Sequence, residues 1–306
     1  EKVKMNNRTR YLSLCNYLME KHKIIVKDIL PKENKPFSKI FLPEKKEFHL
    51  SDLLNIETKK LFTAALVAQL EADEIIEEYL DEFSFPSETS RKVTKVALLN
   101  YAGAAIIMPY EIFFHECVKK HRYDLELLQS TFAVSFEQVC HRVTCLNSPD
   151  PKFRGIPLHM IRVDRSGNVS KRFSLSGIEL PRLSGACPKW NVYSSFSNPG
   201  KISAAVSRMT DGEKYVCIAR TVEKGVSKYG EEKGLLSIGL GCQIKYAKDF
   251  VYADGLNLND EKSESKIGVS CRKCDRLNCG QRAFPPDTQN YDVNINQRGV
   301  SIFVNQ

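Results

Sequence analysis

Three cysteines, Cys271, Cys274 and Cys279, stand in a C-x2-C-x4-C spacing that is typical of a metal site. Buried structural cysteines normally have apolar neighbours, whereas Arg, Lys, Asp and Asn separate these three. A soft-metal site needs four sulfurs or a mixed set of ligands, so a fourth ligand must come from elsewhere. Cys187 is the best candidate, because it precedes a proline in a glycine-containing loop, and the ligand run of bacterial ferredoxins also ends in Cys-Pro.

The identity of the metal stays open at this point. Structural zinc usually has two C-x2-C pairs, whereas one such pair followed by C-x4-C and a distant Cys-Pro favours a [4Fe-4S] cluster. Arg272, Lys273, Arg276 and Arg282 flank the thiols, and their charges would partly offset that of a four-thiolate cluster. Zinc held by the same cysteines is the direct alternative, and a loop without metal is the third.

A second candidate site lies in a basic segment. Residues 152–186 contain seven Lys or Arg and two acids. Two predicted strands meet there in a tight turn at 164–168, which makes a hairpin. Arg162, Lys171 and Arg172 lie around this hairpin, and strand geometry can direct them at one phosphate-bearing ligand through charge-assisted hydrogen bonds. A solvated basic face explains the same residues equally well.

The composition is that of a soluble protein with two domains. A length of 306 residues is too large for one ordinary core. The sequence has neither an apolar run of membrane-spanning length nor an export leader, so we expect a cytoplasmic protein with reduced thiols and a metal site. The net charge of +8 favours anionic partners. Because the chain begins at Glu1 without Met, we expect a fragment whose natural N-terminus is missing.

The two candidate sites fall in the second of two predicted domains, 1–148 and 149–306, which a break at Pro149 and Pro151 separates. The first domain is predicted to be mainly helical. Its expected elements are a helix from Val3 to Met19, short strands at 24–26 and 40–42, and helices that begin after Asn55, after Ser87, at Tyr110, at Tyr123 and after Ser135, the last with a Ser135-x-x-Gln138 capping box.

Period-two hydrophobicity predicts a mainly antiparallel sheet in the second domain. Its expected strands are 158–163, 169–175, 215–222 and 235–244, with Asp211-Gly212 at a hairpin turn. Trp190, the only tryptophan, is predicted to belong to the core.

Ordered motifs extend over nearly the whole chain. They cover 123–128, 134–142, 162–164, 167–172, Gly185-Ala186-Cys187-Pro188-x-Trp190-Asn191-Val192, 218–221, Gly239-x-Gly241-Cys242 and 271–286. Together they resemble the short-chain fatty-acyl transcriptional regulator family, which are bacterial regulators of acetate and propionate use.

The resemblance implies an Xre-type DNA-binding domain, a middle domain derived from IrrE-like metallopeptidases and a C-terminal sensory domain. That last domain is expected to bind coenzyme A or a short-chain acyl-CoA and, where four cysteines are present, a [4Fe-4S] cluster. The predicted fold class is therefore α+β: a mainly helical, degenerate metallopeptidase-like domain, then a mainly antiparallel β sensory domain with a cysteine-ligated metal cluster. The sequence from Glu1 onwards contains no Xre-type domain, so we expect that domain to be missing from a truncated chain.

No enzyme activity is expected. Residues 62–70, where the peptidase ancestor has its zinc helix, contain no histidine and no glutamate, so hydrolysis would lack both metal and base. His115-Glu116 and His121 do not replace that motif, because H-E-x-x-H places its histidines four residues apart. A peptidase-derived hydrolase therefore remains only as a lesser alternative, beside a zinc-stabilised interaction module.

We accordingly predict the ligand-sensing region of a transcriptional regulator. The predicted metal ligands are Cys187, Cys271, Cys274 and Cys279. The predicted contacts to the acyl-CoA effector are Arg162, Asn168, Lys171 and Arg172. Operator DNA would be bound through the missing domain, and we expect a homodimer or a higher homo-oligomer, because DNA-binding regulators usually have twofold symmetry.

Overall fold

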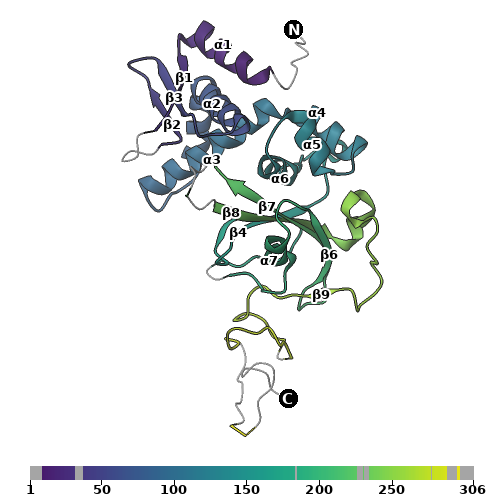
Figure 1. Ribbon diagram of the computed structural model, residues 1–306. Coiled ribbons are helices and arrows are strands. Elements are labelled where there is room, and N and C mark those ends of the chain that lie inside the picture. The colour runs from purple at the N-terminus through teal and green to yellow at the C-terminus, as the bar shows by residue number, and fades with distance from the viewer. Residues whose placement is uncertain are drawn as a thin grey trace. The chain divides into compact units, whose positions relative to one another are not determined.

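The computed structural model describes residues 9–31, 37–182, 185–225, 230, 234–276, 278–287 and 295–296. The chain divides into two compact units (Figure 1). Unit 1 comprises Glu1–Glu116, Glu126–Arg142 and Gly225–Lys233, and unit 2 comprises Cys117–Leu125, Val143–Lys224 and Gly234–Gln306. The predicted mixture of a helical N-terminal part and a sheet-rich C-terminal part is confirmed.

Local capping signals set the starts of the helices in the first half of the chain. Asn55 accepts a hydrogen bond from the Thr58 N–H at 3.0 Å, and Ser87 exchanges hydrogen bonds with Ser90. The predicted capping box of Ser135 with Gln138 is also present. The helices are α1 (Arg10–His22), α2 (Ile56–Asp81), α3 (Glu88–Ile107), α4 (Tyr110–Phe114), the π-helix η1 (His115–Lys120), α5 (Leu125–Phe132) and α6 (Phe136–Thr144).

Two helix predictions were inaccurate in detail. The helix predicted from Val3 begins at Arg10 within the described chain, and residues 3–8 lie outside the described residues. The helix predicted from Tyr110 changes to a π-helix at His115. Among the described residues, no single helix is both long enough and apolar enough to span a membrane. Helix α3 reaches that length and composition only when it is counted together with Tyr110–Lys120, and the two segments are bent by 70° relative to each other.

Unit 1 also contains a three-stranded sheet. Its strands are β1 (Ile25–Ile29), β2 (Lys39–Leu42) and β3 (Glu47–Ser51), in the order β1-β3-β2. β1 runs parallel to β3 and β2 runs antiparallel to it. The sequence predicted β1 and β2, whereas β3 was missed because Glu47 and His49 alternate with only two large apolar residues.

A mainly antiparallel six-stranded sheet forms unit 2, as predicted. Its described strands follow the order β5-β4-β8-β7-β6-β9, and only β9 pairs in parallel. Two short strands were missed, because serine and alanine dominate β6 and β9 has two residues. The strands are β4 (Leu158–Asp164), β5 (Val169–Ser174), β6 (Ser203–Arg208), β7 (Lys214–Lys224), β8 (Gly234–Gln243) and β9 (Ser265–Lys266).

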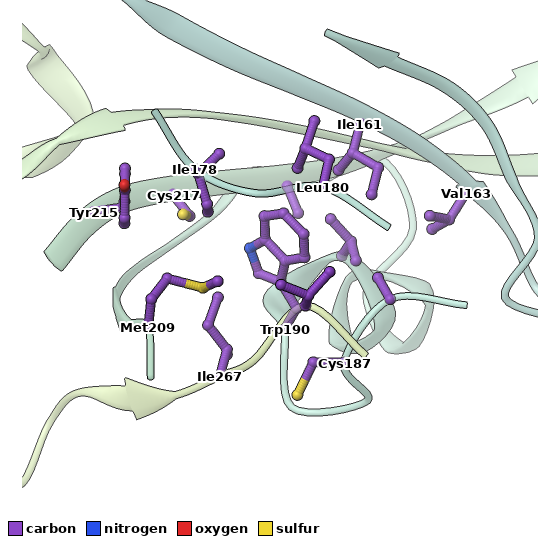
Figure 2. Packing of buried hydrophobic residues seen from close by; sticks show 14 residues of the cluster. Ile161, Val163, Ile178, Leu180, Cys187, Trp190, Met209, Tyr215, Cys217 and Ile267 are labelled. Atoms are coloured by element: carbon purple, nitrogen blue, oxygen red, sulfur yellow. The ribbon is translucent and has the colours of Figure 1, made fainter. Parts of the chain in front are cut away.

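The core of unit 2 is built around Trp190, which is 2% exposed (Figure 2). This residue precedes the short helix α7 (Asn191–Ser194), which packs on β7 and β8. Gly239 permits the close approach, because a Cβ there would lie 2.5 Å from Cγ1 of Val192. A Cβ on Gly241 would likewise overlap the buried His159 ring. The Gly239-x-Gly241 motif is thus a packing feature of the sheet.

Candidate metal and ligand sites

The segment that leads to the cysteine loop is fixed to one edge of the unit 2 sheet. β9 pairs with β6, and the Ile267 N–H donates to the Arg208 carbonyl at 2.9 Å. Ile267 and Val269 belong to the same hydrophobic cluster as Trp190 and Cys187 (Figure 2). The core therefore places the start of the loop beside Cys187, more than eighty residues earlier in the sequence.

Gly268 is the point at which two predicted ligands meet. Its N–H lies near enough to the Cys187 thiol to lower the pKa of that thiol, and a Cβ at this position would lie 2.8 Å from Sγ of Cys274. Burial raises the pKa of Cys187, the N–H groups of Gly268 and Lys189 oppose that rise, and the nearby Cys271 and Cys274 thiols add to it. The Cys187 thiol thus lies near the thiols of Cys271 and Cys274.

Cys271 and Cys279 are more exposed. The Ala283 N–H donates to Sγ of Cys271 at 3.5 Å. Cys279 lines a surface hollow of about 700 Å³ together with Lys189, Lys266 and Arg276. Thiols that accept N–H hydrogen bonds are chemically suited to bind a metal as thiolates. However, no three His, Cys, Asp or Glu side chains in the described part of the chain are close enough to share one metal ion, so the four-cysteine site stays a prediction.

Arg282 lies at the centre of the cysteine loop and is 5% exposed. Its Nη1 donates to the carbonyls of Cys271 at 2.7 Å and Phe284 at 3.1 Å. Its Nη2 donates to those of Cys274 at 2.6 Å and Arg276 at 2.9 Å. Sequence reasoning gave this arginine a role in charge compensation alone and missed that it binds the backbone.

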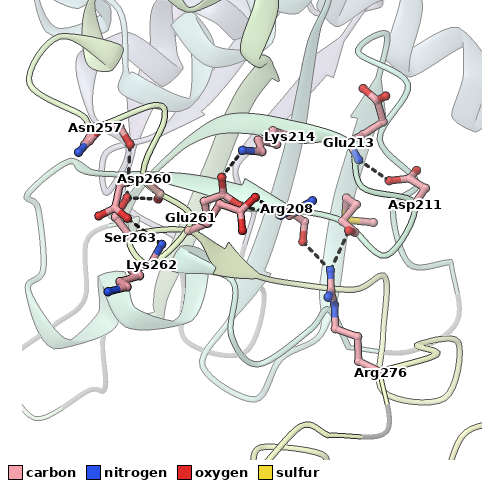
Figure 3. A network of polar contacts seen from close by, with 12 residues as sticks. Arg208, Asp211, Glu213, Lys214, Asn257, Asp260, Glu261, Lys262, Ser263 and Arg276 are labelled. Carbon is pink, nitrogen blue, oxygen red and sulfur yellow. Dashed lines mark hydrogen bonds and ion pairs between the residues drawn. The ribbon is translucent and has the colours of Figure 1, made fainter.

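The other three cations of the loop also have specific neighbours. Arg276 donates to the carbonyls of Arg208 and Met209, as Figure 3 shows. Lys273 pairs with Glu179 at 3.1 Å. Arg272 lies 4.8 Å from the Phe284 ring centroid and 3.5 Å from Asp287. These contacts tie the loop to itself and to the edge of the sheet.

A buried carboxylate stabilises the same edge. The Glu264 side chain is 0% exposed, forms a short ion pair with Lys214 and lies 3.6 Å from Arg208. Glu261 pairs with the same arginine from an exposed position (Figure 3). Because buried charges need partners, this arrangement holds the chain just before β9 against β6 and β7.

The predicted phosphate-binding residues are divided between two faces of the β4–β5 hairpin. Arg162 stands directly opposite Lys171, and its Nε donates to Oγ of Ser170 at 2.9 Å. Arg172 stands opposite Ile161, whose side chain belongs to the core cluster. Successive residues of a strand point to opposite faces, so Arg172 lies on the other face from Lys171.

Arg172 and Asn168 have their own settings. Arg172 donates to the carbonyls of Pro181 and Arg182, and the three residues Arg172, Arg182 and Lys273 line a hollow of about 580 Å³. Asn168 holds the turn by donating to both carboxylate oxygens of Asp164 at 2.9 Å, and this lowers the pKa of that carboxyl. The structure therefore pairs Arg162 with Lys171 across the hairpin, places Arg172 on the other face and uses Asn168 to hold the turn.

The degenerate peptidase segment packs as an ordinary core helix. Residues 63–68 of α2 are buried, and the Thr63 hydroxyl donates to the Lys59 carbonyl at 2.8 Å. His115 is exposed at the start of η1. Residues 63–68 thus belong to the buried part of α2 and carry no metal-ligating side chain.

Comparison with known families gives two matches that divide the chain between them. The family model described as "Short-chain fatty acyl coenzyme A regulator, C-terminal" matches residues 145–303. The "IrrE N-terminal-like domain" matches residues 41–144. The two matches agree with the resemblance that the sequence motifs indicated.

Curated relatives are transcriptional regulators. The HTH-type transcriptional regulator RamB of Mycobacterium tuberculosis is 40% identical over 79% of this chain and 51% of its own length. The propionyl-CoA carboxylase regulator of Cereibacter sphaeroides is 38% identical over 76% of this chain and 50% of its own. The chain thus spans about half the length of these relatives.

A solved structure shares the fold over nearly the whole chain. It is a Mycobacterium tuberculosis transcriptional regulator, which superposes with a TM-score of 0.90 at 30% identity. The match covers 98% of this chain and 90% of that chain. Both units therefore have counterparts in a regulator of known structure.

Proposed function

Because this chain belongs to the short-chain fatty acyl coenzyme A regulator family, we propose that it is the ligand-sensing region of a transcriptional regulator of short-chain fatty acid use. The observation that carries the proposal is the family match over 145–303, which includes both candidate sites. Regulators of acetate or propionate use need a signal that reports these acids, and their coenzyme A thioesters carry that information. The α2 core, which lacks peptidase ligands, supports a binding role in place of hydrolysis.

The proposed effector is coenzyme A or a short-chain acyl-CoA. Its phosphates would bind the cations of the β4–β5 hairpin by charge-assisted hydrogen bonds. Arg162 and Lys171 are the stronger pair of candidates, because they stand opposite each other on adjacent strands. Arg172 and Asn168 remain proposed contacts, with Arg172 beside the hollow it shares with Lys273.

Propionyl-CoA titrated calorimetrically into the chain tests this part. We expect binding that Lys171→Met weakens by about tenfold, since a charge-assisted hydrogen bond contributes about 1.5–3 kcal/mol. Lys201→Met is the matched control, because Lys201 is exposed and lies outside the hairpin. Absence of any binding at millimolar propionyl-CoA would refute the sensor proposal, and equal weakening by both variants would refute the proposed contacts.

The proposed cofactor is a [4Fe-4S] cluster held by Cys187, Cys271, Cys274 and Cys279. Such a cluster would supply a redox-sensitive cross-link between two segments distant in sequence. Support comes from Gly268, which lies near the thiols of both Cys187 and Cys274. Zinc bound by the same four cysteines is the second candidate, and it would have a purely structural role.

Metal analysis of protein purified without oxygen distinguishes a [4Fe-4S] cluster from zinc. We expect iron and acid-labile sulfide near four per chain, both lost in Cys274→Ser and both retained in Cys145→Ser, since Cys145 is not among the proposed ligands. Stoichiometric zinc without sulfide would replace the cluster by a zinc-stabilised module. Retention of metal in Cys274→Ser would contradict the assigned ligands.

The proposed macromolecular partners are operator DNA and a second copy of the chain. DNA would be bound by a domain outside this sequence, as the "HTH-type" relatives suggest. An effector alters regulation only if it binds the DNA-competent and DNA-incompetent states unequally. Sedimentation of the full-length protein with its operator should show a dimer whose DNA affinity changes with propionyl-CoA, and a monomer at high concentration would contradict the twofold arrangement.

A further inference from the structure

The carbonyl groups of the cysteine loop converge on one side chain. Four of them, from Cys271, Cys274, Arg276 and Phe284, accept hydrogen bonds from the two Nη atoms of Arg282. Two of these carbonyls belong to proposed metal ligands. The guanidinium is buried, so each bond replaces one that water would otherwise make.

Only a planar, forked donor can satisfy this arrangement. Each Nη of the guanidinium carries two N–H groups, and each reaches two carbonyls from different parts of the loop. The ammonium of a lysine has the same charge, but its donors radiate from a single atom. Geometry, and not charge alone, therefore distinguishes the two residues at this position.

We propose that Arg282 is the positioning residue of the cysteine loop: it closes the loop around its own guanidinium and so presents Cys271 and Cys274 before any metal binds. The ligand-presenting part of this inference rests on the proposed metal site. The loop-closing part rests only on the hydrogen bonds within the chain. Arg282 acts through the backbone of the ligands and does not contact the metal.

Hydrogen exchange of the metal-free chain tests the loop-closing part. Arg282→Lys should accelerate exchange of the Cys274 and Arg282 amides, whose acceptors are the carbonyls of Cys271 and Cys279, by at least about tenfold. Exchange in β7 should stay unchanged. Arg154→Lys is the control, since Arg154 also donates to two backbone carbonyls but is exposed and lies outside the cysteine loop. Equal exchange in the unaltered chain and Arg282→Lys would overturn the inference.

Cobalt(II) supplies the readout for ligand presentation. The unaltered chain and Arg154→Lys should give the absorption bands of tetrahedral thiolate-bound cobalt, and Arg282→Lys should need at least about tenfold more metal to reach them. Identical titrations would overturn the presenting role. Absence of these bands from the unaltered chain would overturn the proposed metal site, and with it ligand presentation, while the exchange result still decides loop closure.

The unaltered chain also provides a test that needs no folded variant. In metal-free protein, Nη protons that are held in hydrogen bonds to buried carbonyls exchange slowly and give separate nuclear magnetic resonance signals. Separate signals assigned to Arg282 would support the inference. A single averaged signal, as given by solvent-exposed arginines, would overturn it.

Discussion

Gly268 lies against Cys274 so closely that a Cβ on the glycine would come within 2.8 Å of the thiol sulfur and 3.0 Å of the cysteine Cβ. The N–H of the same glycine acts on the Cys187 thiol and lowers its pKa. A residue without a side chain thus lies beside two proposed ligands.

Gly268→Ala should lower the free energy of unfolding of unit 2 by about 1–3 kcal/mol, as overpacking does in a filled core. The same change should prevent metal retention, because Cys187 and Cys274 would be forced apart. Denaturant unfolding followed by Trp190 fluorescence, together with metal analysis, measures both effects. Gly234→Ala is the matched control, since its Cβ would meet Lys224 only at an ordinary 3.5 Å. Equal behaviour of the two variants would contradict the assigned contact.

The buried His159 should make unit 2 sensitive to acid. Burial lowers its pKa from 6.5 to about 3, so the unfolded chain binds a proton that the folded chain rejects over this range. Stability must therefore fall as the pH falls from about 6.5 to about 3. Between pH 7 and pH 5 this residue should account for about 2 kcal/mol of lost stability.

His159→Gln should remove that part of the pH dependence, since glutamine does not titrate and can still reach Ser176, which lies 2.9 Å from Nδ1. His115→Gln is the control, because the His115 side chain is exposed. The free energy of unfolding at the two pH values is the measurement. An unchanged pH dependence in His159→Gln would show that the histidine is protonated in the folded protein.

Two alanine-to-glycine changes should have opposite signs. Ala133 has a φ of 48°, a left-handed conformation that costs a residue with a Cβ about 1–2 kcal/mol. Ala133→Gly should therefore stabilise unit 1 by about 0.5–1 kcal/mol. Ala97→Gly, in the exposed interior of α3, should destabilise it by about 1 kcal/mol. Thermal unfolding of both variants checks the pair, and stabilisation by neither would contradict the left-handed assignment.

Glu264 and Glu261 both approach Arg208, but only the first is buried. Glu264→Gln should destabilise unit 2 by about 3 kcal/mol, because it leaves Lys214 and Arg208 without their buried counter-charge. Glu261→Gln should cost less than about 0.5 kcal/mol, as exposed ion pairs do. Denaturant unfolding of the two variants compares them directly. Similar losses in both would mean that the Glu264 carboxylate is hydrated.

The sequence predicted those features that depend on local signals. Asn55, Ser87 and Ser135 set helix starts because an N-cap acts on its own next turn. The hairpin at Asp211-Gly212 was equally local, and Gly212 has the positive φ that such a turn needs. Strand β9 could not be predicted, since its two residues pair with β6, more than fifty positions away.

For the candidate sites, too, the sequence predicted what depends on local signals and missed what depends on the fold. Cysteine spacing indicated which residues could bind metal, whereas the role of Arg282 depends on carbonyls that only the folded loop brings together. The cations of the basic hairpin were predicted to face one ligand, because they lie around one turn in the sequence. Strand alternation instead puts Lys171 and Arg172 on opposite faces, because β5 has a side-chain period of two.

The position of Lys171 and Arg172 on opposite faces of β5 has a consequence for binding free energies. β5 is an edge strand of the described sheet, so a ligand that touched both Lys171 and Arg172 would have to pass around the edge. Substitutions of these two sequence neighbours should therefore have additive effects on binding. The non-additive pair should be Arg162 and Lys171, which are far apart in sequence and directly opposed in space.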